Sequence, residues 1–424
     1  MIDIKRIVEN RKEVEQGLVK RMDREEMHLD EIVKLYERKL ELIKEYESKR
    51  AQQNSFNDKM ATTAKDSDEF RKLLEELKGL SSQVKGIERE LNETDQKLSS
   101  LLEVLPNIPD DDVVGGEKEN NEVVKTVGER PVFDFEAKDH VQLGSELHLF
   151  DFDRATKLSG NNFSMYTGMG ARLEWALLNY FIDEHIKDGY EMVLPPHIVG
   201  RESGYTAGQL PKFEGDVYWL KDEDQFLIPT SETSLTNMFR GEILEEKDLP
   251  KRYFAYTPCY RREAGSYRAN EKGLIRVHQF NKVEMYQFTT KESSEVAFEE
   301  LVSKAEKLVQ GLGLHYRVSK LAAGDCSAAA AKTFDIEIWI PSMGQYYEVS
   351  SISNVRDYQA RRGDMRYKPK EGEKTEYMHT LNASGLATSR LMVALVETYQ
   401  QKDGSILIPD VLRRYIGIDK IMGE

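Results

Sequence analysis

Charged and aromatic side chains alternate along one short segment of this chain, residues 275–286. If that segment is a β-strand, Arg276, Phe280 and Glu284 line up on one face, because successive side chains point to opposite sides of a sheet. A cation, an aromatic ring and a carboxylate in one row suit a phosphate, a flat base and an ammonium group. The segment therefore predicts a binding site for a charged ligand that carries an aromatic group.

The segment just before it repeats the pattern. Arg261 and Glu263 lie two residues apart and would share one face of a neighbouring strand, and the connecting residues 264–273 are small, polar and basic. Neither of the two common phosphate-binding loops, GxxxxGK[ST] and GxGxxG, occurs in the chain, and no zinc-binding spacing of His or Cys is found. We therefore expect any nucleotide to be held by these side chains, and we expect no zinc.

Apolar residues repeat at heptad spacing in residues 1–105. One series steps by four and three residues from Leu29 to Ile43, and a longer one runs from Phe70 to Leu105. This spacing predicts two long helices, and the turn-prone residues 62–67 between them predict an antiparallel coiled-coil hairpin. Helices of about 35–40 residues would give an arm about 50–60 Å long. Heptads alone would equally fit a dimerising coiled coil or a structural spacer.

The rest of the chain has a different pattern. Residues 106–131 contain prolines, a glycine pair and acidic residues without periodicity, and are expected to form a linker. Residues 132–424 alternate amphipathic helices with hairpin-like runs of strands, which favours an α+β domain with an antiparallel β-sheet flanked by helices. The expected helices are Ala171–Lys187, Glu292–Leu312 and Thr388–Gln401.

Net charge, cysteine content and hydropathy disfavour several classes of protein. The chain has 424 residues and a net charge of −15, so an RNA partner would need local basic patches rather than general electrostatic attraction. Its two cysteines, Cys259 and Cys326, are far apart, which disfavours a disulfide framework. No stretch is apolar enough for a membrane helix, and residues 1–10 lack a signal-peptide pattern, so a cytoplasmic protein is expected.

Four segments together resemble a known family. Residues 260–263 followed by 273–285 (GLIRVHQFNKVEM) resemble motif 2 of class II aminoacyl-tRNA synthetases, in the form found in seryl-tRNA synthetases of bacterial type. Residues 189–196 resemble motif 1, residues 382–390 resemble motif 3, and residues 229–232 resemble the family's serine-binding TxE element. The N-terminal hairpin is similar to the family's tRNA-binding arm, so the resemblance covers essentially the whole chain.

The resemblance implies how ATP would be bound. Arg261 would hold the α-phosphate, and Arg276 and Arg390 the bent triphosphate and the base; these three are the expected catalytic groups, because fixed cations stabilise charge that develops at phosphorus. Phe280 would stack on adenine, with the Arg390 guanidinium on the other face. The expected ATP-binding residues are Arg261, Arg262, Glu263, Val277, Phe280, Glu348, Val349, Ser350, Ser351 and Arg390.

A magnesium site and a serine pocket follow from the same resemblance. Glu348 and Ser351, in a predicted pair of strands, would coordinate Mg²⁺ that bridges the ATP phosphates, although its residue type alone would make Glu348 an ordinary strand carboxylate. A pocket that reads a hydroxyl would reject alanine, because its buried polar groups would then be unpaired. The expected serine-binding residues are Thr230, Ser231, Glu232, Arg261, Glu284, Asn382 and Ser384.

The implied reaction is serine activation by ATP, followed by transfer to the 3′ end of tRNA(Ser), with tRNA(Sec) as a further acceptor to consider. The resemblance also implies a homodimer through motif 1, and tRNA contacts from the arm and the motif 2 loop. The sequence leaves two other functions open. One is an amino-acid ligase that charges a carrier protein, although relatives of that kind lack a long arm; the other is a catalytically inactive paralogue that serves as an RNA-binding or scaffolding protein. Ala383 and Ser389 stand where the family usually has glycine, and Ser389 directly precedes Arg390.

Overall fold

The computed structural model describes residues 1–263, 272–370 and 373–423, and the chain divides into two compact units. One unit comprises Ile2–Pro106, and the other comprises Asn107–Glu424 together with Met1. Among these described residues, no helix combines the length and the apolarity that a membrane-spanning segment needs.

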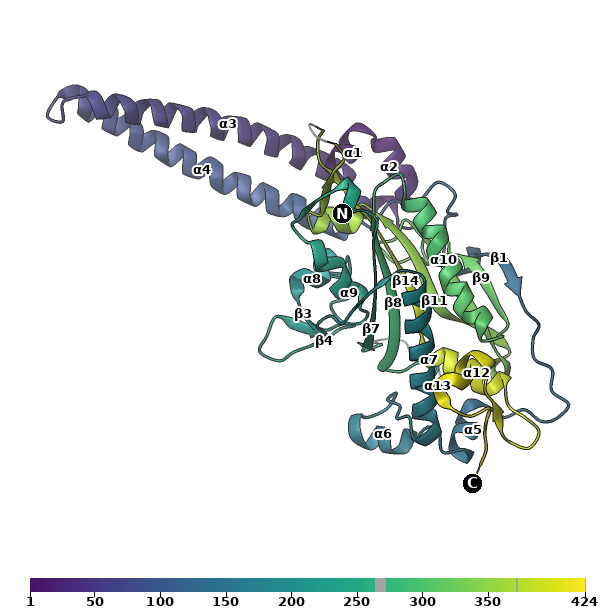
Figure 1. Cartoon of the computed structure of the whole chain (residues 1–424). Coiled ribbons are helices and arrows are strands. Elements are labelled where there is room, and N and C mark those ends of the chain that lie inside the picture. Colours follow the sequence, from purple (N-terminus) through teal and green to yellow (C-terminus); the bar gives the residue numbers. More distant parts are fainter. Residues whose placement is uncertain (264–271, 371–372, 424) are drawn as a thin grey trace. The chain divides into compact units, whose positions relative to one another are not determined.

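The smaller unit is helical and is dominated by a long hairpin (Figure 1). Helices α3 (Leu29–Thr62) and α4 (Asp68–Val104) have 34 and 37 residues, and pack along a seam that buries Leu80 and Leu98. The Ser67 hydroxyl caps α4 by accepting a hydrogen bond from the Phe70 N–H. The predicted helical hairpin is confirmed. The short elements α1 (Ile4–Glu9), α2 (Arg11–Leu18) and η1 (Arg24–Met27) precede it.

The larger unit is built on an eight-stranded sheet with the order β1-β9-β10-β11-β14-β8-β7-β2. All neighbouring strands are antiparallel except β2 and β7, so the α+β prediction with an antiparallel-dominated sheet is confirmed. The strands are β1 (Glu122–Val127), β2 (Glu191–Val193), β7 (Lys251–Tyr260), β8 (Gln279–Thr289), β9 (Tyr316–Lys320), β10 (Lys332–Ile340), β11 (Gln345–Arg356) and β14 (His379–Ala387).

Three helices and one face of the sheet form the main core. Helices α7 (Gly168–Lys187), α10 (Ser294–Gly311) and α12 (Thr388–Thr398) bury apolar side chains with Val283 and Met285 of β8. Because side chains alternate along a strand, Lys282 and Glu284 point to the opposite face. That face is apolar again further along β8, at Tyr286 and Phe288. The polar site therefore lies at the beginning of β8, on the face away from the three helices.

Shorter elements complete the larger unit. The helices are η2 (Lys118–Asn120), α5 (His140–Glu146), α6 (Phe152–Ser159), α8 (Arg201–Thr206), α9 (Glu232–Thr236), η3 (Asn237–Phe239), η4 (Glu246–Asp248), η5 (Pro341–Met343), α11 (Tyr358–Arg362) and α13 (Asp410–Ile416). The small sheets contain β3 (Ile198–Gly200), β4 (Tyr218–Trp219), β5 (Gln225–Leu227), β6 (Ile243–Glu245), β12 (Arg366–Lys368), β13 (Glu376–Tyr377), β15 (Ile406–Leu407) and β16 (Lys420–Ile421).

The segment expected to be a linker, 106–131, contains ordered structure. It includes β1, which pairs with β9 as an edge strand of the large sheet. The Asn107 side chain donates hydrogen bonds to the carbonyls of Ala329 and Val355, at 2.9 and 2.8 Å. Its prolines and glycines interrupt any periodicity, so the hydrogen bonds that fix the segment were not visible as a sequence pattern.

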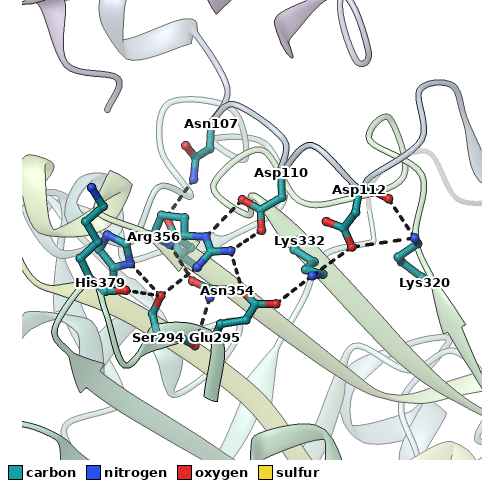
Figure 2. A network of polar contacts seen from close by, with 12 residues as sticks. Asn107, Asp110, Asp112, Ser294, Glu295, Lys320, Lys332, Asn354, Arg356 and His379 are labelled. Carbon is teal, nitrogen blue, oxygen red and sulfur yellow. Dashed lines mark hydrogen bonds and ion pairs between the residues drawn. The ribbon is translucent and has the colours of Figure 1, made fainter. Parts of the chain in front are cut away.

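A chain of ion pairs also fastens this segment to the sheet (Figure 2). The Arg356 Nε donates to Asp110 Oδ1 at 3.1 Å, and its Nη2 donates to Glu295 Oε2 at 2.7 Å. The Lys332 ammonium lies 2.9 Å from Glu295 and 3.0 Å from Asp112. Residues 110–112 are thus held to α10, β10 and β11 by alternating charges.

Candidate active site

Two adjoining hollows open on the polar face of the sheet. The larger, with a volume of about 450 Å³, is lined by Thr230, Glu232 and Arg261 among others. The narrower hollow of about 60 Å³ has Arg276 and Phe280 in its wall. Arg261 and Glu263 line both hollows. A ligand with two parts could therefore place one part in each hollow, with its junction at Arg261.

A buried polar cluster lies beside the larger hollow. The Lys282 ammonium forms an ion pair with Glu284 and donates a hydrogen bond to Thr230 Oγ1 at 2.7 Å. The Thr230 hydroxyl in turn donates to Glu284 Oε2 at 3.2 Å. Each of the three residues is at most 6% exposed, so the charges of Lys282 and Glu284 are largely shielded from water. Lys282 neutralises a carboxylate that would otherwise be costly to bury.

Glu232 is a second carboxylate at the larger hollow, half-buried and with amide donors around it. Its Oε1 accepts hydrogen bonds from Gln359 Nε2 at 2.8 Å and from Asn382 Nδ2 at 3.0 Å. Burial, followed by repulsion from Glu284, raises the pKa of Glu232 to about 7. A ligand ammonium group in the larger hollow would favour the ionised form of this carboxyl.

Three arginines converge on the narrower hollow. The Arg261 guanidinium lies 5.1 Å from the centre of the Phe280 ring, and its Nε donates to the Pro229 carbonyl at 3.2 Å. Arg276 Nη1 lies 2.5 Å from Glu263 Oε2. Arg390, in the first turn of α12, also lines this hollow. Fixed cations around an aromatic ring can bind a phosphorylated aromatic ligand.

Arg390 is held by backbone carbonyls on two sides. Its Nε donates to Ile275 O at 3.1 Å, and its Nη1 donates to Glu348 O at 3.0 Å. Ser389, just before it, is buried and lines the same hollow, whereas Ala383 is buried within β14. The two residues that depart from the family pattern therefore leave Arg390 at the hollow with its hydrogen bonds formed.

The prediction that Arg261, Glu263 and Arg276 lie on strands beside the narrower hollow was wrong. Strand β7 ends at Tyr260, and β8 begins only at Gln279, so Arg261, Glu263 and Arg276 lie outside the strands. Glu263 has a φ of +50°, a left-handed conformation that ends the alternation of a strand. Arg276 nevertheless lines the same hollow as Phe280. The two residues come together through turns, not through a shared strand face.

Glu348 and Ser351 lie on β11, as the predicted pair of strands requires, and β10 pairs with β11. Both line a third hollow of about 410 Å³, together with Asp335 of β10. Asp335 Oδ1 is buried and has no hydrogen-bond partner in the described part of the chain. Burial, followed by the neighbouring Glu348 carboxylate, raises the pKa of Asp335. Among the residues that the structure describes, no three His, Cys, Asp or Glu side chains gather as a metal cage.

The other expected residues fall into two groups. Val277, Val349 and Ser384 line the narrower hollow. Three do not contact either of the first two hollows: Ser231 is fully buried, Ser350 donates from its hydroxyl to the Ser384 carbonyl at 2.5 Å, and Arg262 donates to the Gly215 carbonyl at 3.2 Å. Of the expected motif 2 loop, residues 264–271 lie outside the described residues.

Known proteins resemble this chain over nearly its full length. Residues 1–109 match the model of the seryl-tRNA synthetase N-terminal domain, and residues 218–399 match the tRNA synthetase class II core domain (G, H, P, S and T). Serine–tRNA ligase 2 of Clostridium acetobutylicum is 53% identical over 427 residues, which cover 99% of this chain and 100% of that relative. This chain belongs to the seryl-tRNA synthetase family.

Solved structures of the seryl-tRNA synthetase family have the same fold. The crystal structure of seryl-tRNA synthetase from Pyrococcus horikoshii complexed with ATP has a TM-score of 0.93 and 35% identity, and the match covers 100% of both chains. The cytoplasmic serine–tRNA ligase from Naegleria fowleri in complex with AMP has a TM-score of 0.87 and 26% identity, covering 100% of this chain and 99% of that one.

Sequence reasoning missed three polar residues in this member of the seryl-tRNA synthetase family. Lys282 stood in the alternating segment between Phe280 and Glu284, so its position on the site face could have been found. Gln359 lies on α11 and Asp335 on β10, where no motif marks them. Only the tertiary fold brings these two residues to the site.

Proposed function

We propose that this member of the seryl-tRNA synthetase family acts as a serine–tRNA ligase. Serine would attack the α-phosphorus of ATP to form seryl-adenylate and release pyrophosphate, and the seryl group would then pass to the 3′ end of tRNA(Ser). The observation that carries the proposal is the pair of adjoining hollows that share Arg261, since an aminoacyl-adenylate also has two parts joined at one phosphate. The full-length similarity to a serine–tRNA ligase supports it.

Serine would occupy the larger hollow. Its ammonium group would meet the carboxylates of Glu232 and Glu284, and its carboxylate would face Arg261. Thr230 and Asn382 carry polar groups available to its hydroxyl, and their hydrogen bonds in the structure support such a role. Ser384 lines the adjoining narrower hollow and would add a third polar group from that side. Alanine would leave these groups unpaired, which gives selection without an editing step.

ATP would occupy the narrower hollow. Phe280 would stack on adenine, and the guanidinium of Arg390 would cover the opposite face of the base. Arg261 and Arg276 would stabilise the charge that develops on the phosphate oxygens, and Glu263 would orient the adenine end. These cations are held by carbonyl or carboxylate partners, which supports catalysis by preorganised charge. Positioning and charge would carry the rate without a dedicated protein base.

Glu348 and Ser351 would hold Mg²⁺ with ATP. Their oxygen atoms suit a hard cation, and the unpartnered Asp335 oxygen in the same hollow adds an acidic group. Bound Mg²⁺ would neutralise phosphate charge. The small number of protein donors fits an ion that shares its coordination with phosphates and water. In this scheme the protein residues orient the ion, while the arginines bind the remaining phosphate oxygens.

For tRNA, the unit formed by Ile2–Pro106 would serve as the binding arm and residues 132–424 as the catalytic domain. A long helical hairpin can recognise RNA by shape and backbone, which suits a structured tRNA. The exposed apolar residues Met192 and Leu194 near β2 support a homodimer through motif 1. In such a dimer, the arm of one subunit would bind a tRNA whose acceptor end enters the other subunit.

Aminoacylation with purified components tests the complete reaction. The protein should transfer labelled serine to tRNA(Ser) in the presence of ATP and Mg²⁺, releasing AMP and pyrophosphate. Parallel reactions with tRNA(Sec), and with a phosphopantetheinylated carrier protein, identify the acceptor. Transfer to the carrier protein alone would contradict the proposal, as would ATP turnover without any seryl-tRNA.

A further inference from the structure

A buried histidine–glutamate pair lies close to the residues that line the narrower hollow. His140 begins α5 and Glu397 lies near the end of α12, and their side chains are 3% and 0% exposed. Glu397 Oε1 lies 2.9 Å from His140 Nδ1 and accepts the His140 backbone N–H at 2.9 Å. The Ser342 N–H and hydroxyl also donate to this carboxylate, both at 2.9 Å. Four donors therefore satisfy a carboxylate that water does not reach.

The second ring nitrogen of His140 fixes its tautomer. The Leu274 backbone N–H lies 3.3 Å from His140 Nε2 and can only donate. Nε2 must then carry no proton, and Nδ1 carries the hydrogen that is donated to Glu397. Glu397 thus ensures that His140 presents an acceptor to the backbone of Leu274.

The two residues after Leu274, Ile275 and Arg276, line the narrower hollow. The Ile275 carbonyl accepts from Arg390 Nε at 3.1 Å, and Arg276 lines the hollow. Arg390 and Glu397 are seven residues apart on α12, and so lie about two turns apart on the same side of the helix. Helix α12 therefore holds residues 274–276 at two points, directly through Arg390 and indirectly through Glu397 and His140.

The backbone before Leu274 is packed against the imidazole. Gly273 has a φ of +60°, and a Cβ atom at this position would lie 2.2 Å from His140 Nε2. Such close approach leaves no room for a side chain at position 273. The backbone at Gly273 and Leu274, which leads towards β8, is thus packed closely against His140.

We propose that His140, oriented by Glu397, is a positioning residue for ATP activation. By binding the Leu274 N–H, it fixes the turn that carries Arg276 and the carbonyl that holds Arg390. The proposal rests on the proposed function of the narrower hollow as the ATP site. A positioning role differs from a purely structural one in its effect on the two substrates. Loss of the Leu274 contact should impair ATP use and leave serine binding intact.

Two polar substitutions of similar size separate the two contacts of His140. His140→Asn keeps an amide donor near Nδ1 for Glu397 but does not reach Leu274, whereas His140→Gln places an amide oxygen near Nε2. In serine-dependent ATP–pyrophosphate exchange, His140→Asn should raise the KM for ATP roughly tenfold, since small displacements of positioning groups have large kinetic effects. The KM for serine should stay within about twofold, and His140→Gln should recover most of the loss.

Equal KM values for ATP in the two variants would overturn the proposal, as would parallel rises in the KM for ATP and for serine. Thermal melting establishes that both variants are folded under the assay conditions. If the unsubstituted protein shows no exchange, the proposed function fails separately. Calorimetric titration with ATP then tests the positioning role alone: weaker binding by His140→Asn than by His140→Gln supports it, and equal or absent binding overturns it.

Discussion

Two consecutive arginines have different surroundings at the residue scale. The Arg261 guanidinium faces Phe280 and lines both hollows, whereas the guanidinium of Arg262 donates to the Gly215 carbonyl. Arg261→Ala should lower the rate of pyrophosphate exchange by roughly 10²–10³, as expected for one charge-stabilising donor. Arg262→Ala is the matched control and should cost less than about tenfold. Comparable losses in the two variants, measured by steady-state kinetics, would contradict the role given to Arg261.

Glu232 should make serine binding depend on pH. Its pKa is raised to about 7, so its carboxylate is fully available for the serine ammonium only above that pH. The KM for serine should therefore fall as pH rises from 6 to 8. Glu232→Gln mimics the protonated form and should give a high KM without this dependence. If the KM for serine of the unsubstituted protein did not change between pH 6 and 8, Glu232 would not be the group that binds the serine ammonium.

Glu174 provides a control with a similar pKa and a different location. Burial raises its pKa to about 7, and it accepts hydrogen bonds from Asn281 and Thr388 instead of lining the hollows. In both glutamates the folded-state pKa exceeds the unfolded value, so the unfolding free energy should fall as pH rises from about 4.5 to 7, by about 3 kcal/mol each. Glu174→Gln should remove its share of this fall and leave the KM for serine unchanged.

At the element scale, the helical arm can be weakened without changing the larger unit. Leu98 is 3% exposed in the seam of the hairpin, and Leu98→Ala should lower the stability of the arm by about 2–4 kcal/mol. Leu74 is 37% exposed on the same helix, and Leu74→Ala should stay within about 0.5 kcal/mol. Amide hydrogen exchange measures the stability of the arm. Pyrophosphate exchange should be unchanged in both variants. A loss of pyrophosphate exchange in Leu98→Ala would contradict the claim that the larger unit activates serine independently of the arm.

Elements with a regular period could be predicted from sequence. Helices α3 and α4 follow heptads, and α7, α10 and α12 were expected within a few residues of their observed bounds. The pairing of β10 with β11 was also expected. Strand β1 was missed because an edge strand among prolines and glycines has no alternation to detect. The turns at Glu263 and Arg276 were missed because the segment alternates beyond the end of the ladder.

Site residues were predictable where a motif names them. Arg261, Phe280, Glu348 and Arg390 were expected and line the hollows. Other supporting residues come from distant parts of the chain: His140 accepts the Leu274 N–H, Gln359 donates to Glu232, and Glu397 accepts from His140. Such partners follow from tertiary packing and have no local pattern.

At the scale of the whole molecule, the exposed apolar surface near β2 predicts the assembly. Leu194 is 73% exposed in the expected motif 1 interface, and Leu158 on α6 is 76% exposed elsewhere. The protein should sediment as a dimer, and Leu194→Arg should shift it towards monomer because a buried unpaired charge is costly. Leu158→Arg should remain dimeric. A monomer in the unsubstituted protein, or a Leu194→Arg variant that stays fully dimeric, would contradict this interface.

Amino-acid-dependent ATP–pyrophosphate exchange without tRNA tests the central claim most directly. Serine, threonine, alanine, glycine and cysteine would be compared under the same conditions. The polar groups of Thr230, Glu232 and Asn382 predict exchange that strongly favours serine, with alanine disfavoured by about 10⁴ because those groups would be unpaired. Exchange with none of these amino acids, or exchange that favours alanine or glycine over serine, would contradict a serine-activating site.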